Sequence, residues 1–159
     1  SLNIVIGGAA GAIPPVIGWT AVVPELSFLP FSLFVIIFFW TPPHFWALSL
    51  YRYNDYKSAN VPMLPNVSSI EDTKKQIVYY AVILILSSYL PYLDSNVGII
   101  YLAIVTILNL LLLNSSLKLK KSKEKKSIPN SEGLKFFAIS ILYLFSLFSA
   151  LLIDHLVLR

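Results

Sequence analysis

Five long apolar stretches constrain what this chain can fold into more than any other feature of its sequence. The 159 residues are 57% hydrophobic and only 13% charged, and the mean hydropathy is +0.74. A soluble domain of this size needs more charge to cover its surface, whereas about 20 apolar residues let an α-helix cross a bilayer. The composition therefore predicts an integral membrane protein, with a single all-α, polytopic transmembrane helical bundle over residues 1–159.

The arrangement of positive charge predicts the topology. The five expected spans cover about residues 3–23, 31–51, 75–93, 97–117 and 134–156. Eleven of the twelve Lys and Arg residues lie in residues 52–75 and 118–135, which are on the same side of the membrane by parity. By the positive-inside rule, the predicted loop from Arg52 to Lys74 and the lysine run from Lys118 to Lys126 both face the cytoplasm. We interpret the run as a topology determinant rather than a binding site for anionic lipid.

The first span combines close glycines with a double proline. Gly7 and Gly11 have the small-xxx-small spacing that lets a neighbouring helix approach closely in lipid. Pro14 and Pro15 each remove an amide donor, and we expect this to leave the carbonyls of Ala10 and its neighbour without helix partners. Two interpretations follow: a kinked packing helix, or a helix whose free carbonyls contact a ligand.

The stretch from Trp40 to Pro65 concentrates the unusual chemistry, since it holds a second double proline, a histidine in a span and a charged loop. If one helix continues through to Asp55, 100° per residue places His44, Tyr51 and Asp55 within about 20° of a common line. At 1.5 Å per residue, His44 lies roughly 16 Å from Asp55. Such a face suits an amphipathic ligand that has an apolar body and an anionic head.

His44 allows two interpretations. An ionisable side chain inside a span indicates a functional contact by default. The alternative is a structural histidine that hydrogen-bonds a backbone carbonyl freed by Pro42 and Pro43, such as that of Phe38 or Phe39.

Asp55 is also ambiguous when taken by itself, because a carboxylate in an interfacial loop is usually only solvated. Arg52 and Lys57 lie close to it in the sequence and could neutralise phosphate oxygens. Mg²⁺ characteristically uses one or two carboxylates together with substrate phosphates. The absence of cysteine excludes thiolate and disulfide chemistry.

Three sequence blocks resemble the protoheme IX farnesyltransferase (heme O synthase) family of the intramembrane aromatic prenyltransferase superfamily. The blocks are G-G-A-A-G-A-I-P-P-V-I-G-W, W-T-P-P-H-F-W-A-L-S-L-Y-R and D-Y-x-x-A-x-x-P-M-L-P, and a weaker match, F-x-x-S-I-L-Y-L-F, lies in the last span. The resemblance implies a nine-helix fold of which this chain supplies the last five spans, as the C-terminal half of a longer prenyltransferase. The first aspartate-rich loop of that superfamily, N-x-x-x-D-x-x-x-D, is not in this sequence.

The resemblance implies transfer of a farnesyl group from farnesyl diphosphate to a vinyl group of haem B, which gives haem O. It assigns Asp55 to the second aspartate-rich loop, where the carboxylate binds the diphosphate through Mg²⁺, with Arg52 and Lys57 as phosphate partners. His44 is the candidate for holding haem. Three aromatic residues are expected to line the same cavity: Trp40, Trp46 and Tyr51.

The expected partners are farnesyl diphosphate, haem B and the lipid bilayer, without nucleic acid, and haem A synthase or terminal-oxidase assembly proteins are candidates. The expected location is the cell membrane, or the mitochondrial inner membrane of a eukaryote. Two other functions stay open from the residues alone. Broken helices at mid-bilayer are also typical of half of a membrane transporter, and a quinone precursor could replace haem as the acceptor.

Overall fold

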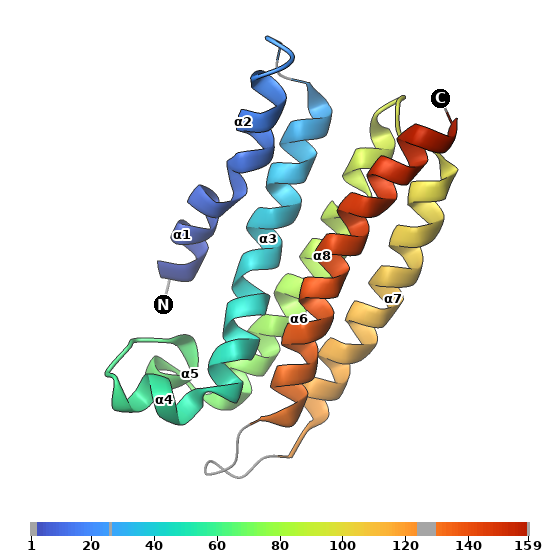
Figure 1. The fold of residues 1–159 in the computed structure, drawn as a ribbon. Helices are drawn as coiled ribbons and strands as arrows, with labels where there is room; N and C mark the ends of the chain where they lie inside the picture. Colours follow the sequence, from blue (N-terminus) through green and yellow to red (C-terminus); the bar gives the residue numbers. More distant parts are fainter. Residues whose placement is uncertain (1–2, 26, 124–129, 159) are drawn as a thin grey trace.

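Four long helices dominate the computed structural model, which describes residues 3–25, 27–123 and 130–158. These described residues contain no strand, and the four long helices are apolar enough to cross a membrane (Figure 1). They are α3 (Phe28–Tyr51), α6 (Ile70–Ser87, continued by the short 3₁₀ helix η1 at Leu90–Leu93), α7 (Ile99–Lys121) and α8 (Ser131–Leu158). The predicted all-α membrane bundle is confirmed.

The first predicted span consists of two shorter helices, α1 (Asn3–Ala12) and α2 (Pro14–Thr20). The chain breaks at Ile13 because Pro14 and the proline after it occupy the first positions of α2, where no amide donor is needed. The amide of Ile13 still reaches the carbonyl oxygen of Ala10 at 3.4 Å. The expectation that Ala10 lacks a partner is therefore wrong.

The glycines of α1 do not act as the sequence spacing predicted. A Cβ atom added at Gly8 would lie 3.2 Å from Cβ of Thr41, so Gly8 is the residue that lets α1 approach α3. At Gly7 and Gly11 no described atom lies within 4 Å of the equivalent position. These two glycines border an open cavity instead of a packed helix.

The second double proline does not interrupt its helix, although the sequence suggested a broken backbone there. α3 is continuous through Pro42 and Pro43, and both side chains are buried. The hydroxyl of Thr41 donates to the carbonyl oxygen of Ile37 at 2.8 Å, one turn earlier. Proline has a φ compatible with a helix, so packing on both sides can keep the helix intact despite the lost amide bonds.

The predicted continuous helix from Trp40 to Asp55 is wrong. Arg52 has φ −95° and ψ 30°, outside the helical region, so α3 ends at Tyr51. A separate short helix, α4 (Tyr53–Ser58), follows at an angle to α3 (Figure 1).

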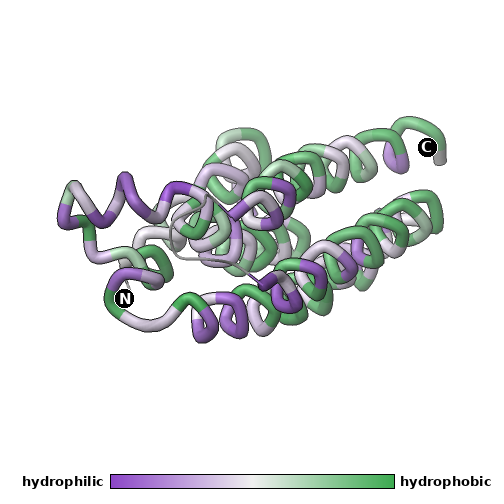
Figure 2. The backbone as a smooth tube through the Cα atoms, turned by 90° about the horizontal axis from the view of Figure 1, so that it is seen from below, coloured by the Kyte–Doolittle hydropathy of each residue, from purple (hydrophilic) through white to green (hydrophobic). Residues whose placement is uncertain are grey.

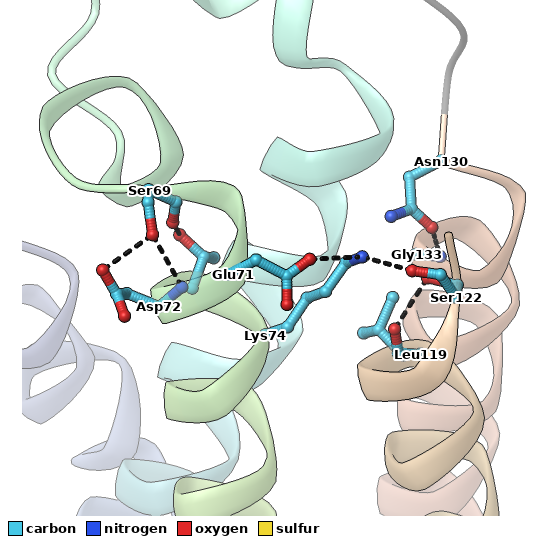
Figure 3. Close-up of polar contacts among 9 residues, drawn as sticks. Ser69, Glu71, Asp72, Lys74, Leu119, Ser122, Asn130 and Gly133 are labelled. Atoms are coloured by element: carbon cyan, nitrogen blue, oxygen red, sulfur yellow. Dashed lines mark hydrogen bonds and ion pairs between the residues drawn. The ribbon is translucent and has the colours of Figure 1, made fainter. Parts of the chain in front are cut away.

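The predicted loop up to Lys74 is also partly helical. α5 spans Leu64–Val67, and α6 begins at Ile70. The start of α6 is set by Ser69, whose hydroxyl accepts a hydrogen bond from the amide of Asp72 at 2.9 Å and donates to its carboxylate at 2.7 Å (Figure 3). The cap satisfies one of the backbone donors that a helix N-terminus leaves free, the amide of Asp72.

The four long helices form a bundle in which α3 and α7 each contact both α6 and α8, and α1 packs against α3. Between them lies an apolar core that includes Ile36, Ala47, Ile77, Val105 and Leu147. A buried polar cluster is embedded in it: Asn109 accepts from the hydroxyl of Tyr143 at 2.9 Å and donates to the hydroxyl of Ser88 at 2.9 Å. These bonds join α7 to α8 and to the C-terminal end of α6.

α4, α5 and the adjoining ends of α7 and α8 lie at one end of the bundle (Figure 1), as parity predicted. Lys74 of α6 is 1% exposed, and its ammonium donates to the carbonyl oxygen of Ser122 at 2.7 Å, just beyond α7 (Figure 3). α7 extends past the predicted end at Leu117 to Lys121, so part of the lysine run is helical. Residues 124–126 of that run lie outside the described residues.

At the opposite end, a buried carboxylate of α8 caps α7. Asp154 is 2% exposed, and its two oxygens accept from the amides of Gly98 at 2.6 Å and Tyr101 at 3.0 Å. A carboxylate at a helix N-terminus satisfies free donors and matches the helix dipole. The outward faces of the long helices are apolar, and Figure 2 shows hydrophobic colouring along much of their length.

Candidate functional site

His44 lies in the packed interface between α3 and α8. Its Nδ1 atom is 2.7 Å from the hydroxyl oxygen of Ser140. We assign the single proton of that hydroxyl to the carbonyl oxygen of Phe137, also 2.7 Å away, so that towards His44 the hydroxyl acts as an acceptor. It follows that the His44 proton is on Nδ1 and that Nε2 of the neutral ring carries a lone pair. Nε2 has no hydrogen-bond partner within the described part of the chain.

Two aromatic rings hold the imidazole between them. The ring centroids of Trp40 and Phe137 lie 4.1 Å and 4.4 Å from that of His44, at interplanar angles of 21° and 26°. The indole nitrogen of Trp40 donates to the backbone oxygen of Ser140 at 2.7 Å. His44 is therefore fixed in position and tautomer by α8. The expected alternative of a bond to a carbonyl of α3 itself is wrong, because the partner is a side chain from another helix.

Trp40 also separates two apolar cavities. One, of about 470 Å³, lies between α2, α3 and α8, and its walls include Pro14, Pro15 and Phe148. The other, of about 410 Å³, lies between α1 and α3 beside Gly11. Both have almost wholly apolar linings, which suits the body of a hydrophobic ligand.

The expected single aromatic wall is divided between different sites. Trp46 borders a third cavity of about 440 Å³ with residues of α5 and α6. Its ring meets that of Tyr80 edge-on at 5.1 Å, and its indole nitrogen has no hydrogen-bond partner among the described residues. Tyr51 borders none of these three cavities, and its ring lies 5.6 Å from the guanidinium carbon of Arg52. Of the three aromatic residues expected in this wall, Trp40 is the one whose ring stacks on His44.

The three charged residues expected at the site lie together on one short segment. The guanidinium of Arg52 forms an ion pair with the carboxylate of Asp55 at 3.0 Å, and the two side chains are 58% and 65% exposed. The ammonium of Lys57 lies 5.8 Å from the ring centre of Tyr53. Exposed ion pairs of this kind contribute at most about 1 kcal/mol to the stability of the fold. A phosphate ligand can therefore rearrange the pair at little cost in free energy.

The residues of this segment fit a magnesium ion only when phosphate supplies further ligands. No group of three or more His, Cys, Asp or Glu side chains in the described ranges could hold a metal. Asp55 nevertheless offers one exposed carboxylate, and one of its oxygens is free of the pair with Arg52. A single carboxylate with phosphate oxygens is a usual way for proteins to bind Mg²⁺.

Residues 1–142 match the UbiA prenyltransferase family, and the chain belongs to this family. The family resemblance of the sequence motifs is confirmed.

The individual relatives carry a more specific name. Proteins named protoheme IX farnesyltransferase from Alcanivorax borkumensis, Pelagibacter ubique and Rhizobium rhizogenes are 47%, 49% and 46% identical to this chain. The matches cover 96%, 96% and 98% of this chain and 49%, 50% and 48% of those proteins. The chain thus spans about half the length of the relatives it matches. No solved structure matches it significantly.

Two residues of the histidine site, Ser140 and Phe137, were assigned no role from the sequence. Both fall in the block F-x-x-S-I-L-Y-L-F, where the serine is the one polar residue in an otherwise apolar segment apart from a tyrosine. A serine on an apolar helix face indicates an interhelical hydrogen bond. The sequence does not identify its partner, because His44 is 96 residues away.

Proposed function

We propose that the full-length protein containing this chain transfers a farnesyl group from farnesyl diphosphate to a vinyl group of haem B and forms haem O. The observation that carries the proposal is the course of α3. This helix carries His44, with Nε2 free, stacked on Trp40, which borders two apolar cavities. It then leads directly into the charged segment at Arg52 and Asp55. The names of the relatives support the same reaction.

The charged segment is proposed to bind the diphosphate. Arg52 and Lys57 would neutralise phosphate oxygens, and Asp55 would hold Mg²⁺ when the ion is bound with the diphosphate. Mg²⁺ bound in this way stabilises the negative charge that develops on the leaving oxygens. The exposure of Arg52 and Asp55 leaves both side chains accessible to a substrate at the membrane surface.

The histidine site is proposed to contact the acceptor. With its proton on Nδ1, His44 presents a lone pair on Nε2, which is the atom and protonation state that ligate haem iron. The hydrogen bond to Ser140 fixes the ring, as partners of metal-binding histidines commonly do. Trp40 stacks on the imidazole and borders both apolar cavities, which would receive the porphyrin edge or the isoprenoid chain.

The proposed reaction replaces the carbon–oxygen bond of farnesyl diphosphate with a carbon–carbon bond to haem. The bond between farnesyl C1 and oxygen breaks, and diphosphate leaves with the electron pair. The π electrons of the haem vinyl group form the new carbon–carbon bond to C1, and water then captures the resulting cation and loses a proton. Arg52 and Lys57 stabilise the leaving group, and charge stabilisation of this kind is usually the largest catalytic effect. The roles of Trp46 and Tyr51 as further substrate contacts remain part of this proposal.

The test uses the full-length protein expressed in cells that lack their own haem O synthase, with haems extracted and separated chromatographically. Asp55→Ala is expected to abolish haem O while the protein still inserts in the membrane. Glu71→Gln is the matched control, because Glu71 is also an exposed carboxylate at the same end of the bundle, 68% exposed. It should leave haem O formation unchanged.

Near-normal haem O in the Asp55→Ala strain would contradict the assignment of the diphosphate site. Failure of the unsubstituted protein to make any haem O, with prenylation of an aromatic quinone precursor instead, would overturn the choice of acceptor. The proposed location is the cell membrane, with α4 and the lysine run on the cytoplasmic side. Attachment of a reporter enzyme after α4 tests that orientation.

A further inference from the structure

A groove unconnected with the proposed reaction lies between α7 and α8 near the end of the bundle that carries the lysine run. It encloses about 390 Å³. Its apolar part is formed by Leu108, Leu111, Ile139 and Leu142, and Tyr143 also lines it. Leu108 and Lys118 are ten residues apart on α7, so the groove extends over roughly 15 Å along the helix axis.

The polar part of the groove lies at its membrane-surface end. Lys118 and Lys135 line it from opposite helices, and the carboxylate of Glu132 pairs with Lys135 at 2.6 Å. Two lysines against one glutamate leave a net positive charge. Lys118 has no ion pair within the described ranges, so its ammonium is available to an external anion.

Ser115 provides a second, independent indication of a ligand. Its side chain is 7% exposed and lines the groove, and its hydroxyl forms no hydrogen bond within the described residues. The hydroxyls of the neighbouring Ser116 and of Ser140 both donate to their own helix. The hydroxyl of Ser115 thus faces the groove with its hydrogen-bonding capacity unused by the described residues. A ligand oxygen in the groove would satisfy it.

We infer that this groove binds one anionic phospholipid from the leaflet that contacts the lysine run. The interpretation of the run as a topology determinant without lipid binding is thereby revised at its first residue, Lys118, which lines the groove. The phosphate would lie between Lys118 and Lys135, a headgroup oxygen would reach Ser115, and an acyl chain would lie along the leucines. Basic pockets between transmembrane helices recognise such lipids by charge, whereas the apolar part alone would accept any acyl chain. The site differs from the cavities at Trp40, which have almost no polar lining.

The test is native mass spectrometry of the purified full-length protein in detergent, titrated with phosphatidylglycerol or with phosphatidylcholine of the same acyl chains. Phosphatidylglycerol should bind about tenfold more tightly, in keeping with the attraction of one or two lysines to an anionic lipid. Lys118→Glu should remove this preference. Lys121→Glu is the matched control. This substitution makes the same charge change in the last turn of α7, but Lys121 does not line the groove.

Leu111→Trp should weaken the binding of both lipids, because the larger side chain fills the apolar part of the groove. Glycerol phosphate added alone distinguishes a lipid site from a phosphate site. Equal binding of the two lipids, equal effects of Lys118→Glu and Lys121→Glu, or binding of glycerol phosphate as tight as that of phosphatidylglycerol would each overturn the inference. None of these readouts depends on haem O formation.

Discussion

The imidazole Nδ1 of His44 lies 2.7 Å from the hydroxyl oxygen of Ser140, and this contact joins α3 to α8. With the serine proton assigned to a backbone carbonyl of its own helix, the histidine donates and the serine accepts. The free Nε2 atom is a consequence of this arrangement. Any function of His44 in contacting haem therefore depends on a residue of the last helix.

Ser140→Ala should weaken haem binding by the full-length protein about 10- to 100-fold, as loss of an orienting partner does in other metal sites. Titration of haem followed by its main absorption band measures the affinity and reports a change of axial ligand. Ser149→Ala is the control, because the Ser149 hydroxyl is exposed and only bonds its own helix at 2.9 Å. If Ser140→Ala left both the haem spectrum and the haem affinity unchanged, that result would contradict a contact between His44 and haem.

Lys74→Met should destabilise the bundle by about 1–3 kcal/mol, because it leaves the carbonyl of Ser122 without its donor at the C-terminal end of α7. The Glu71 partner of Lys74 is well exposed, so the backbone contact matters more than the ion pair. Unfolding in mixed micelles with increasing dodecyl sulfate measures the difference. The adjacent substitution Lys75→Met changes an exposed lysine and should have little effect on stability. Equal losses of stability in the two variants would contradict a structural role for the bond from Lys74 to Ser122.

Gly133→Ala should separate α8 from α3. A Cβ atom at this position would lie 2.9 Å from the backbone oxygen of Ala47, which is too close for any relaxed contact. Overpacking of this kind costs about 1–3 kcal/mol. Gly18→Ala is the matched control, since nothing lies within 4 Å of its added Cβ and alanine favours a helix. If Gly133→Ala were as stable as the control, α8 would have to shift relative to α3 without a loss of stability, which would contradict the prediction.

The buried pair of Asn109 and Tyr143 should show energetic coupling. Asn109→Leu removes the acceptor of the tyrosine hydroxyl, and Tyr143→Phe removes the donor of the same 2.9 Å bond. Either change alone is expected to cost about 1–3 kcal/mol, because it leaves a buried partner unsatisfied. In the double variant the loss should be clearly smaller than the sum. Strict additivity in a double-mutant cycle would mean that the two side chains act independently.

The sequence predicted well where the evidence is local. The end of α3 at Tyr51 agrees with the prediction, and four of the five predicted apolar runs correspond to helices long enough to cross a membrane. The remaining run, residues 3–23, holds the shorter α1 and α2. The division of the first span at Pro14 follows from the missing amide donors of proline. Sequence periodicity failed at Arg52, because a continuous helix was assumed across a residue whose φ and ψ lie outside the helical region.

Other properties were decided only by the tertiary structure. Trp40 and Trp46 are close in sequence, yet they border different cavities, since six residues of helix turn them to different faces. Which glycine of α1 packs on α3 was also not predictable from spacing. Small-residue motifs indicate that a close approach is possible, but the packed neighbour selects the residue that makes it.

The sequence by itself determined that this chain is a helical membrane protein of the prenyltransferase type, because span length, charge distribution and contiguous motifs are properties of neighbouring residues. Only the tertiary structure decided that Ser140 orients His44, that the charged segment turns away from α3, and that Ser115 and Lys118 share a groove with α8. Those relationships join residues of separate helices, and the side-chain packing that sets them has no periodic signal along the chain.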